Sequence, residues 1–171
     1  IDSLRDIGWT ISDDDVLGTE DALIGEQFFP PNSEYDAYVG IRDILAKASA
    51  EIVVVDAYIG SSLLLMLRSL PLRNLSVRLL TTEGNLKADF AIEAATFKKQ
   101  VGHIKLEVLT TAEFHDRFIV IDGTEYYHVG ASIKDAGKRA FMISRIQDRP
   151  NIDSLKKSID QALYSGNVLQ F

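Results

Sequence analysis

The sequence predicts an α/β domain in which a mixed β-sheet is flanked by helices on both faces. Short runs of β-branched and apolar residues alternate with segments whose apolar residues recur at helical spacing, as in a sheet sandwiched between helices. In the middle of the chain, two strand-like runs follow each other with only a short glycine turn at 122–124 between them. This arrangement predicts an antiparallel hairpin within the sheet.

The length and composition suit one substantial domain. Of the 171 residues, 46% are hydrophobic, which is enough for a buried core. We assign 1–32 to an acidic lead-in or linker, which contains the run Asp13-Asp14-Asp15, and 33–171 to the folded domain. Because the first residue is isoleucine, we expect a fragment of a larger parent chain.

Local signals place the elements of this domain along the chain. Ser33 and Asp36 match a capping box, which predicts a helix from 33 to about 50. The other expected strands are at 51–56, 75–80, 103–109, 118–121, 125–129 and 140–146, and the other expected helices are at 60–70, 85–100 and 150–164.

A small-residue turn follows the strand at 51–56 and leads into the helix at 60–70. Asp56 and Tyr58 lie at the carboxyl end of this strand, where ligands gather in open α/β sheets. Both residues are candidates for the rim of a binding site, and the alternative is that the turn is a plain helix cap.

Charge is unevenly distributed along the chain. The formal net charge is −7, but residues 1–60 hold 13 acids and three bases, whereas residues 61–171 hold 12 acids and 15 bases. The basic part permits a phosphate-bearing partner, although it lacks the broad basic stripe of a tight non-specific DNA binder.

The composition excludes several kinds of site. The chain has no cysteine, and its three histidines, His103, His115 and His128, form no zinc-ligand cluster. We expect neither a metal nor a cofactor. The longest apolar run, 63–67, is too short to span a bilayer and no signal peptide is visible, so we expect a cytoplasmic protein without a transmembrane segment.

The stretch FHDRFIVIDG at 114–123 places reactive side chains at a spacing that a mechanism would need. Because alternate residues of a strand point to one face, His115 and Arg117 are expected side by side. Asp122 has the opposite parity and lies where Gly123 begins a turn. This position favours fixing the strand end or pairing with a neighbouring element.

A bend of small residues after the hairpin extends this site. Gly130-Ala131-Ser132 would bring a hydroxyl and free backbone N–H groups beside Arg117, so we expect Arg117, Ser132 and Lys134 to bind phosphate. The loop after the bend holds a basic cluster of Lys134, Lys138 and Arg139. This cluster is either an ordinary solvated loop or an extension of the phosphate grip.

The pattern His115-x-Arg117-x(4)-Asp122, followed by a hairpin and Gly130-x-Ser132, resembles half of a phospholipase D superfamily site. The superfamily signature is His-x-Lys-x(4)-Asp and then Gly-Ser-x-Asn. The resemblance implies a phospholipase D-like half-domain over roughly 35–165, with His115, Arg117 and Asp122 as catalytic-site residues. It also implies that one histidine attacks phosphorus while a second protonates the leaving oxygen.

The run HDRFIVIDGTEYYHVGASIKDAGK also resembles the phospholipase D-like C-terminal domain of eukaryotic proteins that carry an MIT domain. That domain is regarded as a non-catalytic membrane-binding module. The resemblance therefore implies a binding function as an alternative to catalysis.

Two positions depart from the superfamily signature. Arg117 replaces the lysine, and its planar guanidinium is not equivalent to a compact ammonium. Either Ala131 or Ser132 occupies the serine position, and either Ile133 or Lys134 the asparagine position, so the amide is absent.

Three functions remain open. The first is a metal-independent phosphodiesterase of nuclease or effector type, with His115 as nucleophile or general acid and Arg117 as phosphate clamp. The second is an inactive module that reads the phosphate of lipid headgroups or nucleic acid, and the third is a structural domain for assembly. Since only one motif is present, catalysis would need a homodimer or a second motif in the parent chain.

Overall fold

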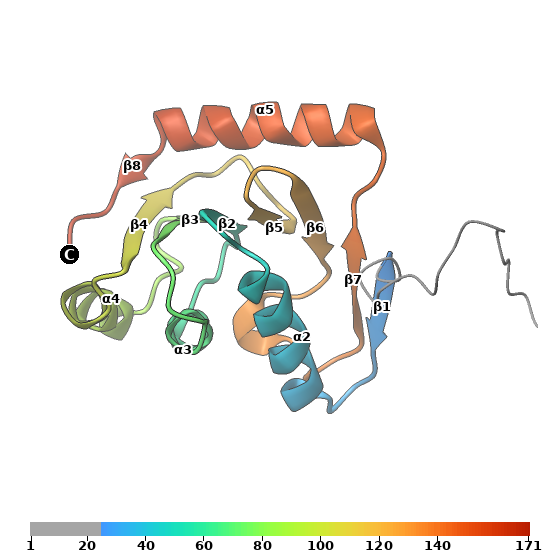
Figure 1. Ribbon diagram of the computed structural model, residues 1–171, viewed down its shortest axis with the longest axis horizontal. Coiled ribbons are helices and arrows are strands. Elements are labelled where there is room, and N and C mark those ends of the chain that lie inside the picture. The colour runs from blue at the N-terminus through green and yellow to red at the C-terminus, as the bar shows by residue number, and fades with distance from the viewer. Residues whose placement is uncertain (1–24) are drawn as a thin grey trace, which may run out of the picture.

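The computed structural model describes residues 25–171, in which strands and helices alternate as the sequence predicts (Figure 1). In chain order the elements are β1 (Glu26–Phe29), α2 (Glu34–Ala46), β2 (Glu51–Val55), α3 (Ser61–Arg68), β3 (Leu75–Thr81), α4 (Ala88–Gln100), β4 (Ile104–Thr110), β5 (Arg117–Ile121), β6 (Glu125–Val129), the 3-10 turn η2 (Ile133–Asp135), β7 (Phe141–Arg145), α5 (Arg149–Ser165) and β8 (Asn167–Val168).

The strands form one mixed sheet in the order β1-β7-β6-β5-β2-β3-β4-β8. Strands β2, β3 and β4 are parallel and are joined through helices α3 and α4. The central hairpin β5–β6 is antiparallel and joins the parallel part where β5 pairs with β2. The prediction of a mixed sheet that contains a hairpin is therefore confirmed.

Helices cover both faces of this sheet, with α2, α3 and α4 on one side and the long helix α5 on the other (Figure 1). Alternation along β2 explains both layers: Ile52 and Val54 join the core under α2–α4, whereas Val53 and Val55 join the core under α5. Burial of each such side chain contributes about 1.5–3 kcal/mol. A strand that is buried on both faces accordingly has a continuous apolar sequence.

The two edge strands were not predicted. Glu26–Phe29, within the expected lead-in at 1–32, forms β1 and pairs with β7, and Phe29 stacks on Phe141 with ring centroids 4.7 Å apart. The folded domain therefore begins before residue 33. Residues 1–24, including Asp13-Asp14-Asp15, lie outside the described residues. At the other edge, β8 pairs with the end of β4.

Helix α2 begins where the sequence predicts, but the predicted capping box does not form. The Ser33 hydroxyl donates to the Pro30 carbonyl at 2.6 Å, and no side chain caps the helix. The helix also ends at Ala46, about four residues early, because the chain turns there to enter β2.

Candidate functional site

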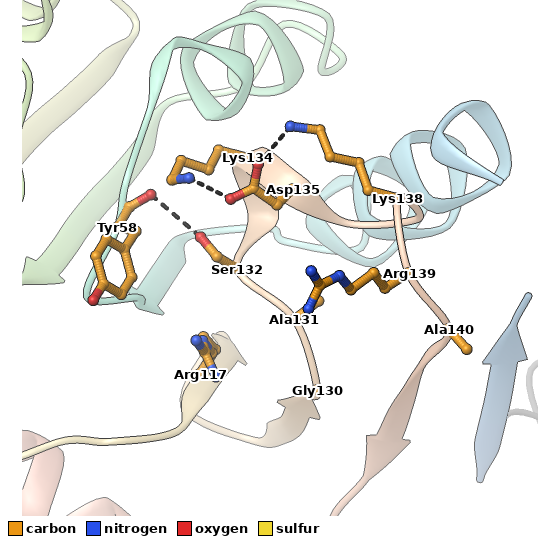
Figure 2. A pocket seen from close by; sticks show the side chains of 10 residues that line it. All are labelled: Tyr58, Arg117, Gly130, Ala131, Ser132, Lys134, Asp135, Lys138, Arg139 and Ala140. Atoms are coloured by element: carbon orange, nitrogen blue, oxygen red, sulfur yellow. Dashed lines mark hydrogen bonds and ion pairs between the residues drawn. The ribbon is translucent and has the colours of Figure 1, made fainter. Parts of the chain in front are cut away.

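A depression of about 590 Å³ lies where β5 begins, beside the end of β6 and the loop that runs through η2 to β7 (Figure 2). We call it the basic pocket. Four basic side chains, one carboxylate and one aromatic ring line it: Arg117, Lys134, Lys138, Arg139, Asp135 and Tyr58. The expected phosphate ligands Arg117, Ser132 and Lys134 thus line one pocket. The candidate catalytic residues His115 and Asp122 do not line it.

Arg117 is the first residue of β5, and the sheet determines its direction. Ile119 and Ile121, on the same face, are buried under α2–α4, so the guanidinium emerges on that side at the strand end. Its Nε atom is buried and has no hydrogen-bond partner. Within residues 25–171, no carboxylate forms an ion pair with Arg117.

Arg139 supplies a second guanidinium to the basic pocket. Its side chain extends from the loop before β7 into the pocket (Figure 2). Among the described residues, this side chain has neither an ion pair nor a hydrogen bond. Two positive groups without anionic partners therefore face the same space.

The two lysines of the pocket are in a different state. Lys134 donates to Asp135 Oδ2, and Lys138 donates to Asp135 Oδ1 at 2.6 Å. The hydrogen bond from Lys134, and to a lesser extent that from Lys138, holds the pKa of the Asp135 carboxyl below its ordinary value. Partial burial of Asp135 acts in the opposite direction. Lys134, which the sequence places among the phosphate ligands, is thus already paired at the rim.

Ser132 has a partner that the sequence does not reveal. Its hydroxyl donates to the buried Asp56 carboxylate, with Oγ 2.9 Å from Oδ2, and is itself 7% exposed. A hydroxyl has one proton to donate, so Ser132 cannot also donate to a phosphate while this bond exists. This hydrogen bond to Asp56 is a positioning contact, and the expected phosphate contact of Ser132 stays a prediction.

Asp56 is an anchor beneath the pocket and not a rim residue. Besides the Ser132 hydroxyl, its carboxylate accepts the backbone N–H of Tyr58 at 2.9 Å and that of Ile133 at 2.8 Å. It is fully buried, and these three donors compensate for the loss of water. Asp56 therefore ties the end of β2 to η2 and fixes two walls of the pocket.

Gly137 holds the loop that carries Lys138 and Arg139. Its φ is +87°, and an added Cβ would lie 2.6 Å from backbone atoms of Glu34. Its carbonyl accepts the Ser33 N–H at 2.9 Å. Only glycine fits this close approach between the loop and the start of α2.

His115 lies before β5, which begins at Arg117, and not within the strand that was expected to place the two side chains side by side. The ladder between β5 and β6 ends at the pair Arg117–Val129. After Val129 the chain turns at Gly130 toward η2, so the residues before Arg117 have no strand partner in β6. The His115 side chain is 99% exposed and does not line the basic pocket. Its Nδ1 lies 3.4 Å from Asp116 Oδ1.

His128 lies on the opposite face of the sheet from Arg117. It pairs with Phe118 across the ladder, and the two rings are 5.7 Å apart. Its Nε2 is 3.5 Å from Asp116 Oδ2. As the alternation predicts, His128 shares the α5 side with Tyr126, whereas Tyr127 joins the core on the other side.

Asp122 lies at the far end of β5 from Arg117. Its carboxylate accepts the backbone N–H groups of Ser49, Ala50 and Glu51, each at 2.8 Å. Burial raises the pKa of the Asp122 carboxyl, but these hydrogen bonds outweigh it and hold the pKa below its ordinary value. Asp122 thus fixes the strand end, as its parity suggests, and is not near the other catalytic-site residues.

Two other kinds of site are missing from the part of the chain that the structure describes. No group of three or more histidine, cysteine, aspartate or glutamate side chains is arranged to hold a metal ion within residues 25–171. In the same residues, no helix has the length and apolar character that crossing a bilayer requires.

The fold has counterparts among solved structures, although no protein-family model and no curated protein matches the chain. Nuc from Salmonella typhimurium, a phospholipase D family member, is similar with a TM-score of 0.65 and 16% identity over 85% of this chain and 97% of Nuc. NucT from Helicobacter pylori is similar with a TM-score of 0.61 and 13% identity over 84% of this chain and 98% of NucT.

Two longer proteins contain the same fold. Phosphatidylserine synthase from Haemophilus influenzae matches with a TM-score of 0.62 and 15% identity over 84% of this chain and 39% of the synthase. TrmBL2, an archaeal chromatin protein described with a novel mode of DNA binding, matches with a TM-score of 0.58 and 16% identity over 89% of this chain. This chain spans 56% of the TrmBL2 chain. The described residues therefore have a fold that recurs in Nuc, NucT, the phosphatidylserine synthase and TrmBL2.

Proposed function

We propose that this domain is a phosphate-binding module and that its ligand occupies the basic pocket. The observation that carries the proposal is the pair of guanidinium groups, Arg117 and Arg139, which face one pocket and lack anionic partners among the described residues. A guanidinium presents N–H donors in a planar fork that matches the oxygens of a phosphate.

The energetic state of Arg117 supports this proposal. A buried donor without an acceptor costs about 1–3 kcal/mol, and more when it is charged. The Nε atom of Arg117 is in this state. A phosphate in the pocket would supply acceptors to the terminal guanidinium nitrogens of Arg117 and Arg139 together and would relieve the repulsion between the two cations.

The pocket supports binding better than hydrolysis. Proton transfer to a leaving group requires an acid within hydrogen-bond reach of the substrate. None of the three histidines lines the basic pocket, and the Ser132 hydroxyl is bonded to Asp56. The groups that remain hold an anion and supply no nucleophile.

Calorimetric titration with inorganic phosphate in the presence of EDTA tests this proposal. We expect binding to the wild-type domain, an affinity about 30-fold lower for Arg117→Ala, and partial recovery for Arg117→Lys, which keeps the charge and loses the fork. Arg149→Ala, on the exposed first turn of α5, is the matched control and should bind as the wild type does. Equal affinities of Arg117→Ala and the wild type would refute the proposal.

A second candidate is a metal-independent phosphodiesterase that acts through His115. The two-residue spacing favours it, since an extended backbone at 115–116 would bring His115 to the Arg117 face, and the fold resembles that of Nuc. A homodimer would supply the second histidine, because an isologous interface presents the same patch twice.

Hydrolysis of bis(p-nitrophenyl) phosphate in EDTA tests this second candidate. It predicts a loss of about 10²- to 10⁴-fold in rate for His115→Ala and no loss for His103→Ala. It also predicts that phosphate promotes a dimer in sedimentation. A wild-type domain that hydrolyses nothing and sediments as a monomer with and without phosphate would eliminate this candidate and leave the binding module.

A further inference from the structure

Tyr58 is held rigidly at the wall of the basic pocket, between β2 and α3. Its backbone N–H donates to Asp56 Oδ1 at 2.9 Å, and its carbonyl oxygen lies 3.3 Å from Ser132 Oγ (Figure 2). Both partners are buried, so the backbone of Tyr58 is fixed from two sides. The ring consequently has a defined position next to the two guanidinium groups.

The ring itself is available to a ligand. Tyr58 is 44% exposed, and its hydroxyl has no hydrogen-bond partner among the described residues. The ammonium of Lys134 lies 5.7 Å from the ring centroid. An exposed aromatic ring beside basic side chains is the arrangement on which nucleobases stack.

No other large apolar side chain is exposed at this pocket in residues 25–171. The remaining exposed ones, such as Leu65, Ile92 and Tyr164, lie on other surfaces. A lipid surface would need an apolar face or a cluster of unpaired basic residues. Of the four basic side chains in the pocket, Lys134 and Lys138 are paired with Asp135. The chain as a whole carries a net charge of −7.

The positions of Tyr58, Arg117 and Arg139 suit one small ligand. In Figure 2, the Tyr58 ring and the Arg139 guanidinium stand on opposite sides of Arg117. The pocket volume of about 590 Å³ is in the range of small-molecule sites. We infer that the bound phosphate belongs to a nucleoside phosphate, with the phosphate between Arg117 and Arg139 and the base stacked on Tyr58.

This inference rests on the proposed phosphate binding and adds the chemical class of the ligand. Two sources carry this chemistry, a free nucleotide and the phosphorylated end of a nucleic acid strand. Both present one phosphate and one accessible base. The net acidic chain favours a short contact of this kind over a long polyanion track.

Titration with three ligands tests the inference: adenosine 5′-monophosphate, ribose 5-phosphate and inorganic phosphate. We expect adenosine monophosphate to bind about 5- to 150-fold more tightly than ribose 5-phosphate, which lacks the base. Tyr58→Leu should abolish this preference and keep the affinity for inorganic phosphate, whereas Tyr58→Phe should keep both. Tyr164→Leu, at an exposed position on α5, is the control variant.

A 5′-phosphorylated oligonucleotide and its unphosphorylated counterpart distinguish the two sources. Tighter binding of the phosphorylated strand than of adenosine monophosphate supports a strand end, and the reverse order supports a free nucleotide. Equal binding of adenosine monophosphate and ribose 5-phosphate would overturn the inference. Binding to phosphatidic acid vesicles by a domain that does not prefer adenosine monophosphate to ribose 5-phosphate would overturn it as well. If inorganic phosphate does not bind at all, the proposed function fails as well.

Discussion

The two ends of β5 carry polar side chains in opposite states. At one end, the Asp122 carboxylate accepts three backbone N–H groups at 2.8 Å. At the other end, about 17 Å away along the strand, the Arg117 guanidinium has a buried nitrogen without a partner. Both residues belong to the same ten-residue stretch, yet the fold satisfies one and leaves the other incomplete.

This difference separates a structural role from a binding role within one motif. A saturated group such as Asp122 stabilises the fold and has little capacity left for a ligand. An unsaturated group such as Arg117 costs stability in the free domain, and its terminal nitrogens remain available to an anion. The comparison predicts that changes near Asp122 affect stability, whereas changes near Arg117 affect binding.

Gly137→Ala has the largest expected effect and should break this separation. We expect a loss of about 3 kcal/mol, because the new methyl group meets the Glu34 backbone and the φ of +87° disfavours alanine. Phosphate affinity should fall as well, since the loop that carries Arg139 must move. Gly84 has a φ of +84° and open space around it, so Gly84→Ala measures the cost of the backbone conformation without a steric clash. This variant should lose about 1 kcal/mol in urea unfolding.

Asp122→Ala should have the next largest effect, and on stability alone. Three backbone donors of Ser49–Glu51 lose a charged acceptor, and water replaces it only in part, so we expect a loss of about 2–3 kcal/mol in the free energy of unfolding. Phosphate affinity at a temperature where the variant is folded should equal that of the wild type. Asp153→Ala, in an exposed ion pair on α5, should change stability by less than about 1 kcal/mol.

Arg117→Met should raise stability and remove phosphate binding. The methionine keeps an apolar stem and eliminates a buried charged donor that lacks an acceptor, so we expect a gain of about 1 kcal/mol in thermal unfolding without phosphate. Arg149→Met on α5 should leave both quantities unchanged. A variant less stable than the wild type would mean that Arg117 has a structural partner in solution.

Acid should weaken the hydrogen bonds that Asp122 accepts. Because the folded-state pKa of Asp122 is lowered, its hydrogen bonds stabilise the fold above the ordinary aspartate pKa of about 3.9, and this contribution disappears as the pH falls through the lower folded-state value. We expect less than about 1 kcal/mol after solvent screening. The slope of stability against pH below pH 4 should therefore be shallower for Asp122→Ala than for the wild type.

Much of the fold could be predicted from local patterns. In β5 and β6, the side of the sheet to which each residue points follows from the alternation of side chains along a strand. Tyr126 and Tyr127 accordingly lie on opposite faces. The edge strands could not be predicted in the same way. β1 has four residues, and its identity as a strand depends on pairing with β7 near the other end of the chain.

The site was predicted in part. The motif at 114–123 identified Arg117, and the loop that follows it identified the basic cluster of Lys134, Lys138 and Arg139. The position of Tyr58 just after the strand at 51–56 identified that residue as a candidate. The contact between Asp56 and Ser132 joins residues 76 positions apart, and no local signal reveals it. The position of His115 depends on where β6 ends, since a strand continues only while its neighbour continues.

The pairing of β1 with β7 also has a consequence for synthesis on the ribosome. Glu26 meets Ser144, roughly 120 residues later in the chain, so β1 waits about 6–24 s for its partner at ordinary translation rates. During that interval Phe28 and Phe29 have no sheet to join. Glu26 before them and Pro30-Pro31 after them disfavour pairing with other nascent chains, as charged and proline residues do beside exposed strands.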